Sequence, residues 1–401
     1  MPRSWKIPGL MGRGLRAAAY LAASVAGVLL ATAGGAKAAQ QNQYDLLTTI
    51  PVAATANPPC TTASPSLAKF DISFTDARDS LYLLADRTNC SLDVFDAGGN
   101  TLLFQVAGFV GQQSSNDVSG PDGVLTVNNR YAFAGDGDST VKIVDLLTHA
   151  FVPGSPTSTG GTARADEMAY DPRDNLVIVA NDADTPPFVS FISTIPDNSG
   201  KFNVVGKITF TDATGGLEQP VWSRRTGLFY ISVPNVNGGP TGEIAIINPK
   251  SRTIVGAFPV NCAPAGLALG RNLEALVGCS DTSTSKGVQI VSLKTGSRLA
   301  NFSNVNGADE VWFNRSTDQY FVGSGSNVNG SAAAKPELGI IDANTRTLTQ
   351  IITTTVGDHS VAVDPVRNHV FLPDTSAPAS GPAGCGCIQV YHLIGEAVAA
   401  K

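Results

Sequence analysis

The chain has 401 residues, with 33 acidic and 27 basic side chains and a net charge of −6 at pH 7. Gly, Pro, Asn, Asp and Thr interrupt short apolar runs along its whole length, and no window keeps the 3.6-residue apolar period of a long helix. The composition therefore predicts an all-β protein, and the acidic balance excludes nucleic acid and anionic membrane surfaces as partners.

The first 38 residues have the pattern of a signal peptide. Basic residues lie among the first 16, an uncharged apolar run follows from residue 17 to 33, and small residues at 36 and 38 suit a signal peptidase. An uncleaved anchor is the alternative, but the run is short and rich in Ala. Cleavage would leave 22 basic residues against 33 acidic ones, a net charge of −11. We expect a periplasmic or secreted protein with no stable membrane insertion after cleavage.

Residues 39–401 repeat one pattern seven times: two short strands joined by a turn, then a loop, then a third and a fourth strand. The first two strands of a repeat and their turn are clearest in MAYDPRDNLVIVAND from Met168 and in VAVDPVRNHVFLPDT from Val361. Equivalent positions recur every 44 to 51 residues. This period is typical of a β-propeller, because a four-stranded blade covers its apolar faces only by stacking against other blades. The sequence predicts a seven-bladed β-propeller with blades from about residue 69 to residue 395.

The last repeat lacks a fourth strand, and a matching strand stands at the other end of the domain. The segment YDLLTTIPV, Tyr44–Val52, resembles fourth strands such as TIVGAFPV and LTQIITTTV. We expect it to pair with Cys387–Ile394 in the last blade. The ring would then be closed by the N-terminal strand, and no sheet edge would stay open at the seam.

The repeats resemble those of YVTN-type propellers, a group related in fold to the β-chain of quinoprotein amine dehydrogenases. The resemblance rests on the turn (V/A)-(D/N)-P-x-x-(N/D) and on the third-strand pattern x-(I/V)-x-(V/I)-(D/N), and it covers almost all of residues 39–401. The YVTN tetrapeptide itself is absent, since the corresponding positions read IVAN, YISV and FLPD. The resemblance implies the blade architecture, but no particular activity, because propellers include structural, binding and catalytic proteins.

Six cysteines, an even number in a protein expected to be exported, predict disulfides. Cys262 and Cys279 flank two adjacent strands of one blade, so we expect a cross-strand bridge there. The other four fall in loops of the first and last blades, where a bridge would reinforce ring closure: Cys60, Cys90, Cys385 and Cys387. The pairing of these four stays open. Two thiols in CGC, without further ligands nearby, make a poor zinc site.

The residues just before the seven inner strands should converge on one mouth of the central channel. In chain order they are Asp71, Asp122, Asp166–Glu167, Glu218–Gln219, Ala265–Gly266, Asp309–Glu310 and Asp358–His359. Six of these seven positions carry an acid. Two interpretations are open. The acids are either solvated residues at the wet end of a channel, or they bind a cation, because carboxylates this close raise one another's pKa values unless a positive charge joins them.

The second interpretation gives each mouth residue a role. Carboxylate and amide oxygens favour Ca²⁺ or Mg²⁺ as the bound cofactor. The expected metal ligands are Glu167, Glu218, Glu310 and His359. The expected contacts of a small-molecule ligand are Asp71, Asp122, Gln219 and Asp358. The sequence thus favours an exported protein that binds a small ligand or a metal ion at the acidic mouth.

Two other classes of function compete with binding. One is a metal-assisted hydrolase or lyase, in which the cation polarises a carbonyl group or a water and His359 or Glu310 moves the proton. Its pocket would be similar in kind to the carboxylate sites of gluconolactonase propellers, although the chain does not carry their motifs residue for residue. The other is a scaffold that binds a protein partner through long loops on the same face, at residues 181–188, 233–243, 323–337 and 373–387. Trp222 and Trp312 fall in inner strands, where packing between blades accounts for them; a role in lining the channel is the alternative.

Overall fold

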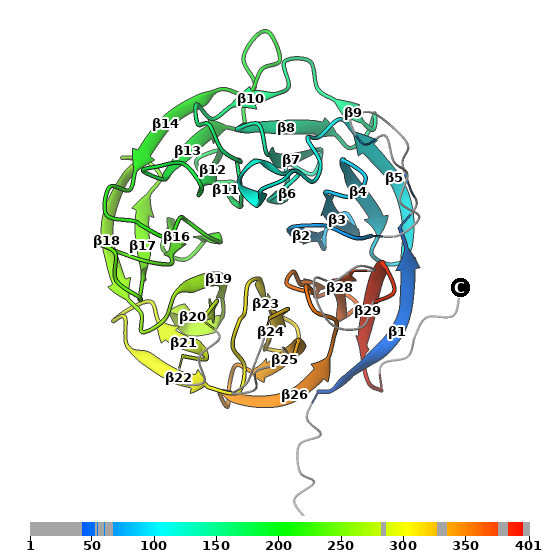
Figure 1. Ribbon diagram of the computed structural model, residues 1–401, viewed down its shortest axis with the longest axis vertical. Helices are drawn as coiled ribbons and strands as arrows, with labels where there is room; N and C mark the ends of the chain where they lie inside the picture. Colours follow the sequence, from blue (N-terminus) through cyan, green and yellow to red (C-terminus); the bar gives the residue numbers. More distant parts are fainter. Residues whose placement is uncertain are drawn as a thin grey trace, which may run out of the picture. The chain divides into compact units, whose positions relative to one another are not determined.

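Seven small antiparallel sheets surround one central axis in the computed structural model (Figure 1). The structure describes residues 42–52, 54, 60, 67–281, 286–326, 335–375 and 384–395, so the predicted signal peptide and parts of the long loops lie outside it. Each inner strand contacts the inner strand of the next sheet, and the last contacts the first, which completes the ring. This arrangement confirms the predicted all-β, seven-bladed propeller.

The blades follow one another in chain order, and the strands of each blade run in order from its inner to its outer edge. The first blade has β2 (Ser73–Asp76), β3 (Leu81–Asp86), β4 (Ser91–Asp96) and β5 (Thr101–Ala107). The second has β6 (Val124–Val127), β7 (Tyr131–Asp136) and β8 (Thr140–Asp145), with β9 (Ala150–Phe151) and β10 (Thr157–Ser158) beside β8. The third has β11 (Met168–Asp171), β12 (Leu176–Asn181), β13 (Phe188–Ser193) and β14 (Val204–Thr209).

The remaining four blades repeat this order. The fourth has β15 (Pro220–Ser223), β16 (Leu228–Val233), β17 (Glu243–Asn248) and β18 (Thr253–Pro259). The fifth has β19 (Pro264–Leu269), β20 (Glu274–Cys279), β21 (Val288–Ser292) and β22 (Arg298–Phe302). The sixth has β23 (Val311–Asn314), β24 (Gln319–Ser324), β25 (Glu337–Asp342) and β26 (Thr347–Thr353). The seventh has β27 (Ala362–Asp364), β28 (His369–Asp374), β29 (Cys387–Leu393) and β1 (Tyr44–Pro51), and two 3₁₀ turns lie at Asn116–Val118 and Arg271–Leu273.

The N-terminal strand β1 completes the seventh blade, where it pairs antiparallel with β29. Tyr44 lies opposite Leu393 in this pairing. The Tyr44 ring is buried edge-on against Phe321 of the sixth blade, with 5.1 Å between ring centroids. Its backbone N–H donates to Gln350 Oε1 at 2.8 Å. The predicted closure of the ring is therefore confirmed, and β1 also fastens the seventh blade to the sixth.

Asp-Pro-x-x-Asn segments form the turns between first and second strands. In the third blade, Asp171 Oδ1 accepts the backbone N–H of Arg173 at 2.8 Å, and Asn175 closes the turn with a φ of 55°. In the seventh blade, Asp364 begins a turn of the same kind and Asn368 ends it with a φ of 54°. Asp suits the first position because its side chain accepts from the backbone two residues on, and Asn tolerates the left-handed conformation. This chemistry explains why the repeat was visible in the sequence.

The outer edge of the second blade departs from the repeat. A full fourth strand was expected after β8, but two short strands, β9 and β10, pair with β8 instead. Pro153 and Pro156 lie between them and have no N–H to offer to a ladder. The interruption follows from these two residues.

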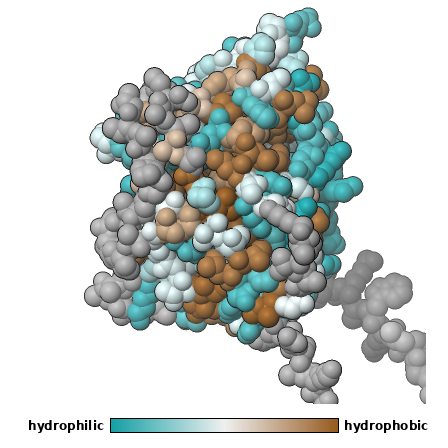
Figure 2. Space-filling model, turned by 90° about the vertical axis from the view of Figure 1, so that its right-hand side faces the viewer, coloured by the Kyte–Doolittle hydropathy of each residue, from teal (hydrophilic) through white to brown (hydrophobic). Residues whose placement is uncertain are grey.

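One apolar cluster fills each of the seven interfaces between neighbouring blades. Ile178 of the third blade and Phe229 of the fourth, for example, are fully buried in one of them. Outer strands carry the exposed positions: Leu46 of β1 and Leu103 of β5 are 52% and 51% exposed. Figure 2 shows the side of the ring that carries these two strands, where hydrophobic surface lies among polar surface.

All six cysteines form disulfides. Cys262–Cys279 is the expected cross-strand bridge in the fifth blade. Cys60–Cys90 fastens the connection between β1 and β2 to the first blade. Cys385–Cys387 closes a local loop at the start of β29, so no disulfide links the first blade to the segment around β29. In the described part of the chain, no helix has the length and apolar character needed to cross a bilayer.

Candidate functional site

The predicted mouth residues are held in place by the backbone ladder of each blade. In five blades, the N–H of the residue two positions before the inner strand donates to a carbonyl group of the second strand. These bonds run from Asp71 to Ala85 (3.0 Å), Asp122 to Gly135 (3.0 Å), Asp166 to Ala180 (2.8 Å), Glu218 to Ser232 (3.0 Å) and Asp309 to Gly323 (3.1 Å). Because the backbone is fixed in the same way each time, residues far apart in sequence meet at one end of the channel.

The mouth contains a cavity of about 320 Å³. Its walls include six of the residues that the sequence placed there: Asp71, Asp166, Glu167, Glu218, Asp309 and His359. The fifth blade contributes no charge, because Gly266 packs against the next blade. A Cβ atom on Gly266 would lie 2.1 Å from the carbonyl oxygen of Asp309.

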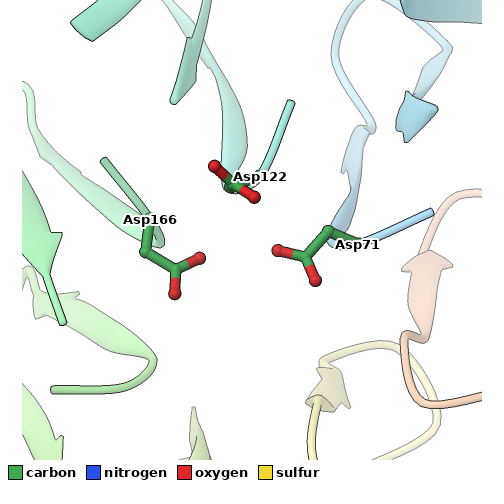
Figure 3. Close-up of side chains that lie close together, drawn as sticks. All are labelled: Asp71, Asp122 and Asp166. Carbon is green, nitrogen blue, oxygen red and sulfur yellow. The ribbon is translucent and has the colours of Figure 1, made fainter. Parts of the chain in front are cut away.

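Three aspartates from the first three blades, Asp71, Asp122 and Asp166, point toward one another (Figure 3). Each offers an oxygen within 4.8 Å of an oxygen of the other two. Two arginines balance them, Arg87 buried and Arg164 partly buried. Arg87 Nη2 lies 3.0 Å from Asp71 Oδ2 and also contacts Asp122, while Arg164 Nη2 lies 2.7 Å from Asp166 Oδ2. We call these five residues the arginine-paired cluster.

The titration of this cluster reflects the competition between burial and pairing. Burial raises the pKa of Asp122 and of Asp166 well above the usual range, although Arg87 and Arg164 oppose the rise. Burial acts in the same direction on Asp71, but the charge of Arg87 and the contact with His359 lower its pKa to about 2. Two guanidinium groups thus already occupy the positions that a cation would take near these aspartates.

A second group of acids lies at the same mouth without such pairing. Glu167, Glu218 and Asp309 offer oxygens within 4.8 Å of one another. Over the described residues, none of the three forms an ion pair within 4.0 Å, and Glu167 Oε2 is buried with no hydrogen-bond donor. Burial raises the pKa of Glu167 and of Glu218 well above the usual range, and neighbouring carboxylates raise both further. We call these three residues the unpaired cluster.

His359 lies beside the arginine-paired cluster. Its ring stacks on Phe70 with 4.7 Å between centroids, and Nδ1 donates to the carbonyl oxygen of Gly357 at 2.6 Å. Nε2 lies 3.7 Å from Asp71 Oδ1. Burial alone would lower the pKa of His359, but Asp71 and Asp309 outweigh it and raise the pKa to about 9. His359 therefore carries a positive charge at pH 7.

The other predicted site residues lie around the cavity rather than on its walls. Gln219 Nε2 donates to Glu310 Oε2 at 3.2 Å, and burial together with the charge of Asp309 raises the pKa of Glu310 to about 8. The carboxylate of Asp358 accepts the backbone N–H of Thr355 at 2.9 Å and is buried. The side chains of His359 and Glu310, which the sequence suggested as a catalytic pair, thus have different partners.

Arg87 and Arg164 did not stand out in the sequence as site residues. Arg164 stands two residues before Asp166, so a search for basic residues near the inner strands would have found it. Arg87 follows a second strand and reaches Asp122 of the next blade, a contact that no local pattern reveals.

Comparison with known proteins supports the fold alone. No family model and no curated protein matches the chain. Among solved structures, it is similar to Kuenenia stuttgartiensis hydrazine synthase, with a TM-score of 0.64 and 12% identity over 85% of this chain and 99% of that one. It is also similar to U3-55K, with a TM-score of 0.61 and 11% identity over 81% of this chain and 96% of that one. At such identities the likeness shows a shared propeller architecture.

Proposed function

We propose that the protein is an exported propeller of the YVTN type that binds one divalent cation at the unpaired cluster of Glu167, Glu218 and Asp309. The observation that carries the proposal is the contrast between the two acidic groups. The arginine-paired cluster has its own cations, whereas the unpaired cluster keeps three converging carboxylates and a buried oxygen, Glu167 Oε2, without a donor. Three disulfides and the leader pattern support export.

Carboxylate oxygens of this kind suit Ca²⁺, which accepts six to eight oxygen ligands in a flexible geometry. Oxygens on opposite sides of Ca²⁺ lie about 4.6–5.2 Å apart, and those on opposite sides of Mg²⁺ about 4.0–4.2 Å apart. The oxygens of the unpaired cluster lie within 4.8 Å of one another, a separation that both ions allow. Glu218 and Asp309 are only partly buried, so water molecules in the cavity would complete the coordination shell.

Binding fits this site better than catalysis at neutral pH. A hydrolase or lyase needs a general base that is ionised at the working pH. The pKa of His359, raised to about 9, and that of Glu310, raised to about 8, leave both groups protonated at pH 7. The two residues expected to move protons would thus serve as acids and not as bases.

Calorimetric titration of the purified protein with Ca²⁺ tests the proposal. We expect one ion per chain, with proton release, because the raised pKa values of Glu167 and Glu218 must fall when the ion binds. Glu218→Gln should weaken binding about tenfold or more. Glu243→Gln is the matched control, since Glu243 is also partly buried but lies on β17 outside the cluster. Absence of binding at about 1 mM Ca²⁺, or equal binding by Glu218→Gln and wild type, would overturn the proposal.

A further inference from the structure

A second cavity lies farther along the channel. It has a volume of about 470 Å³, within the range of small-molecule sites. Glu167, Gln219 and Glu310 line one end of it, and Pro172, in the turn after β11, lines the other. Since the inner strands begin at the acidic mouth, this cavity extends toward the opposite face of the ring.

The walls of this aromatic cavity come from the inner strands. Its large side chains are Phe74, Met168, Tyr170, Trp222, Trp312 and Phe313, all partly exposed. Trp222 follows Gln219 by three residues, which places it about 10 Å farther along the strand than the mouth. The guanidinium of Arg173 lies 5.4 Å from the centroid of the Trp222 ring, so this ring already attracts one cation. Aromatic faces of this kind bind ammonium groups.

Some of the buried polar atoms of the cavity have no hydrogen-bond partner. Glu167 and Glu310 are only 4% and 1% exposed, and Glu167 Oε2 and Glu310 Oε1 are buried without a hydrogen-bond donor in the described ranges. The two carboxyl groups also interact with each other. Trp222 Nε1 is likewise buried without an acceptor. Of the described residues that line this cavity, none is Lys, Arg or His.

We propose that the aromatic cavity binds a small organic cation, with its ammonium group against Glu167 and Glu310 and its apolar body between Trp222 and Trp312. Acidic and aromatic walls without a basic side chain exclude anions and favour a positive head group. The proposal does not depend on calcium. Glu218 and Asp309 line the mouth cavity, Trp222 and Trp312 line the aromatic cavity, and Glu167 lines both.

Energy transfer from tryptophan measures binding at this place. The chain has three tryptophans, Trp5, Trp222 and Trp312, so a full-length Trp5→Phe protein emits only from the two in the cavity. Dansylcadaverine carries a primary amine on an aromatic body that accepts tryptophan emission. N-pentyl dansylamide has the same body without charge, and dansyl-6-aminohexanoate ends in a carboxylate. We expect saturable transfer to the amine, about tenfold weaker binding of the neutral probe, and none of the acid. The titrations contain EDTA, which separates this result from the calcium proposal.

Two variants test the two ends of the cavity. Glu310→Gln should weaken dansylcadaverine binding about tenfold and leave N-pentyl dansylamide within about twofold. Trp222→Leu should weaken both probes, because both use the aromatic wall. Glu243→Gln, outside both cavities, should bind as wild type. Equal binding of the three probes, no saturable transfer up to about 1 mM, or an unchanged preference for the amine in Glu310→Gln would overturn the proposal. The comparison of the three probes on the Trp5→Phe protein tests the proposal even if a cavity variant does not fold.

Discussion

Replacement of Arg87 by Met should reveal how strongly the arginine-paired cluster stabilises the ring. Arg87 is 3% exposed and contacts both Asp71 and Asp122, so its loss leaves two buried carboxylates without their cation. The pKa of Asp71, lowered from 3.8 to about 2, corresponds to about 2 kcal/mol of stabilisation by its surroundings, of which the charge of Arg87 is the largest favourable part. Loss of the contact with Asp122 adds to this. We expect the free energy of unfolding to fall by about 3–5 kcal/mol at pH 7.

The effect of Arg87→Met should depend on pH in a defined direction. Because the pKa of Asp71 is lower in the folded state than in the unfolded state, its stabilising contribution is complete above pH 4 and is lost as the pH falls through about 2. The variant should therefore differ more from wild type at neutral pH than at pH 3, where part of this contribution is already lost. Urea unfolding followed by tryptophan fluorescence at both pH values measures this. A midpoint shift of about 1 M is expected at pH 7.

Arg130→Met is the matched control. Arg130 also pairs with an aspartate, Asp145, at 2.8 Å, but its side chain is 51% exposed, so solvent screens the pair. We expect no change beyond experimental error. If Arg87→Met destabilises the protein no more than Arg130→Met does, or equally at pH 3 and pH 7, then the two buried aspartates do not depend on Arg87 for their charge.

Four further predictions concern the ring and its mouth. His359→Asn should lower the free energy of unfolding by about 1–3 kcal/mol at pH 6 and change it little above pH 10. The pKa of His359 is raised from 6.5 to about 9 in the folded state, so the charged ring stabilises the fold below pH 6.5 and this contribution is lost as the pH rises through 9. Urea unfolding at both pH values checks this. Gly266→Ala should cost about 1–3 kcal/mol, measured by the urea midpoint, since its Cβ would strike the next blade. Tyr44→Ala should cost about 3–5 kcal/mol and speed hydrogen exchange in β1 before other strands. Replacing Cys262 and Cys279 by Ser should lower stability by about 3 kcal/mol under non-reducing conditions, and added dithiothreitol should remove that difference.

The architecture was predictable because its signals are local. Asp171 and Asn175 reveal a turn from five consecutive residues, and the period of the repeat counts the blades. The match of Tyr44–Val52 to other fourth strands was enough to place β1 in the last blade. The broken edge of the second blade was missed, because the repeat pattern was followed and the effect of Pro153 and Pro156 on a strand ladder was not considered.

The site was predictable only in part, because partners across blades depend on three-dimensional contacts. Convergence of the acids followed from the topology, whereas their division into paired and unpaired clusters depends on Arg87 and Arg164. Arg87 lies 35 positions before Asp122 and belongs to another blade. Trp222 was expected to pack between blades, and it does contact the apolar cluster there, but it also lines the aromatic cavity. One side chain can satisfy both environments, and an apolar pattern does not separate them.

The pairing of β1 with β29 makes closure of the ring depend on a contact between the two ends of the domain. Tyr44 and Leu393 stand 349 positions apart, so a ribosome completes β1 long before its partner exists. Six blades assemble from neighbouring hairpins, while the seventh waits for a slow closure across nearly the whole polypeptide. Until β29 is available, β1 is an unpaired strand whose edge can pair with another chain.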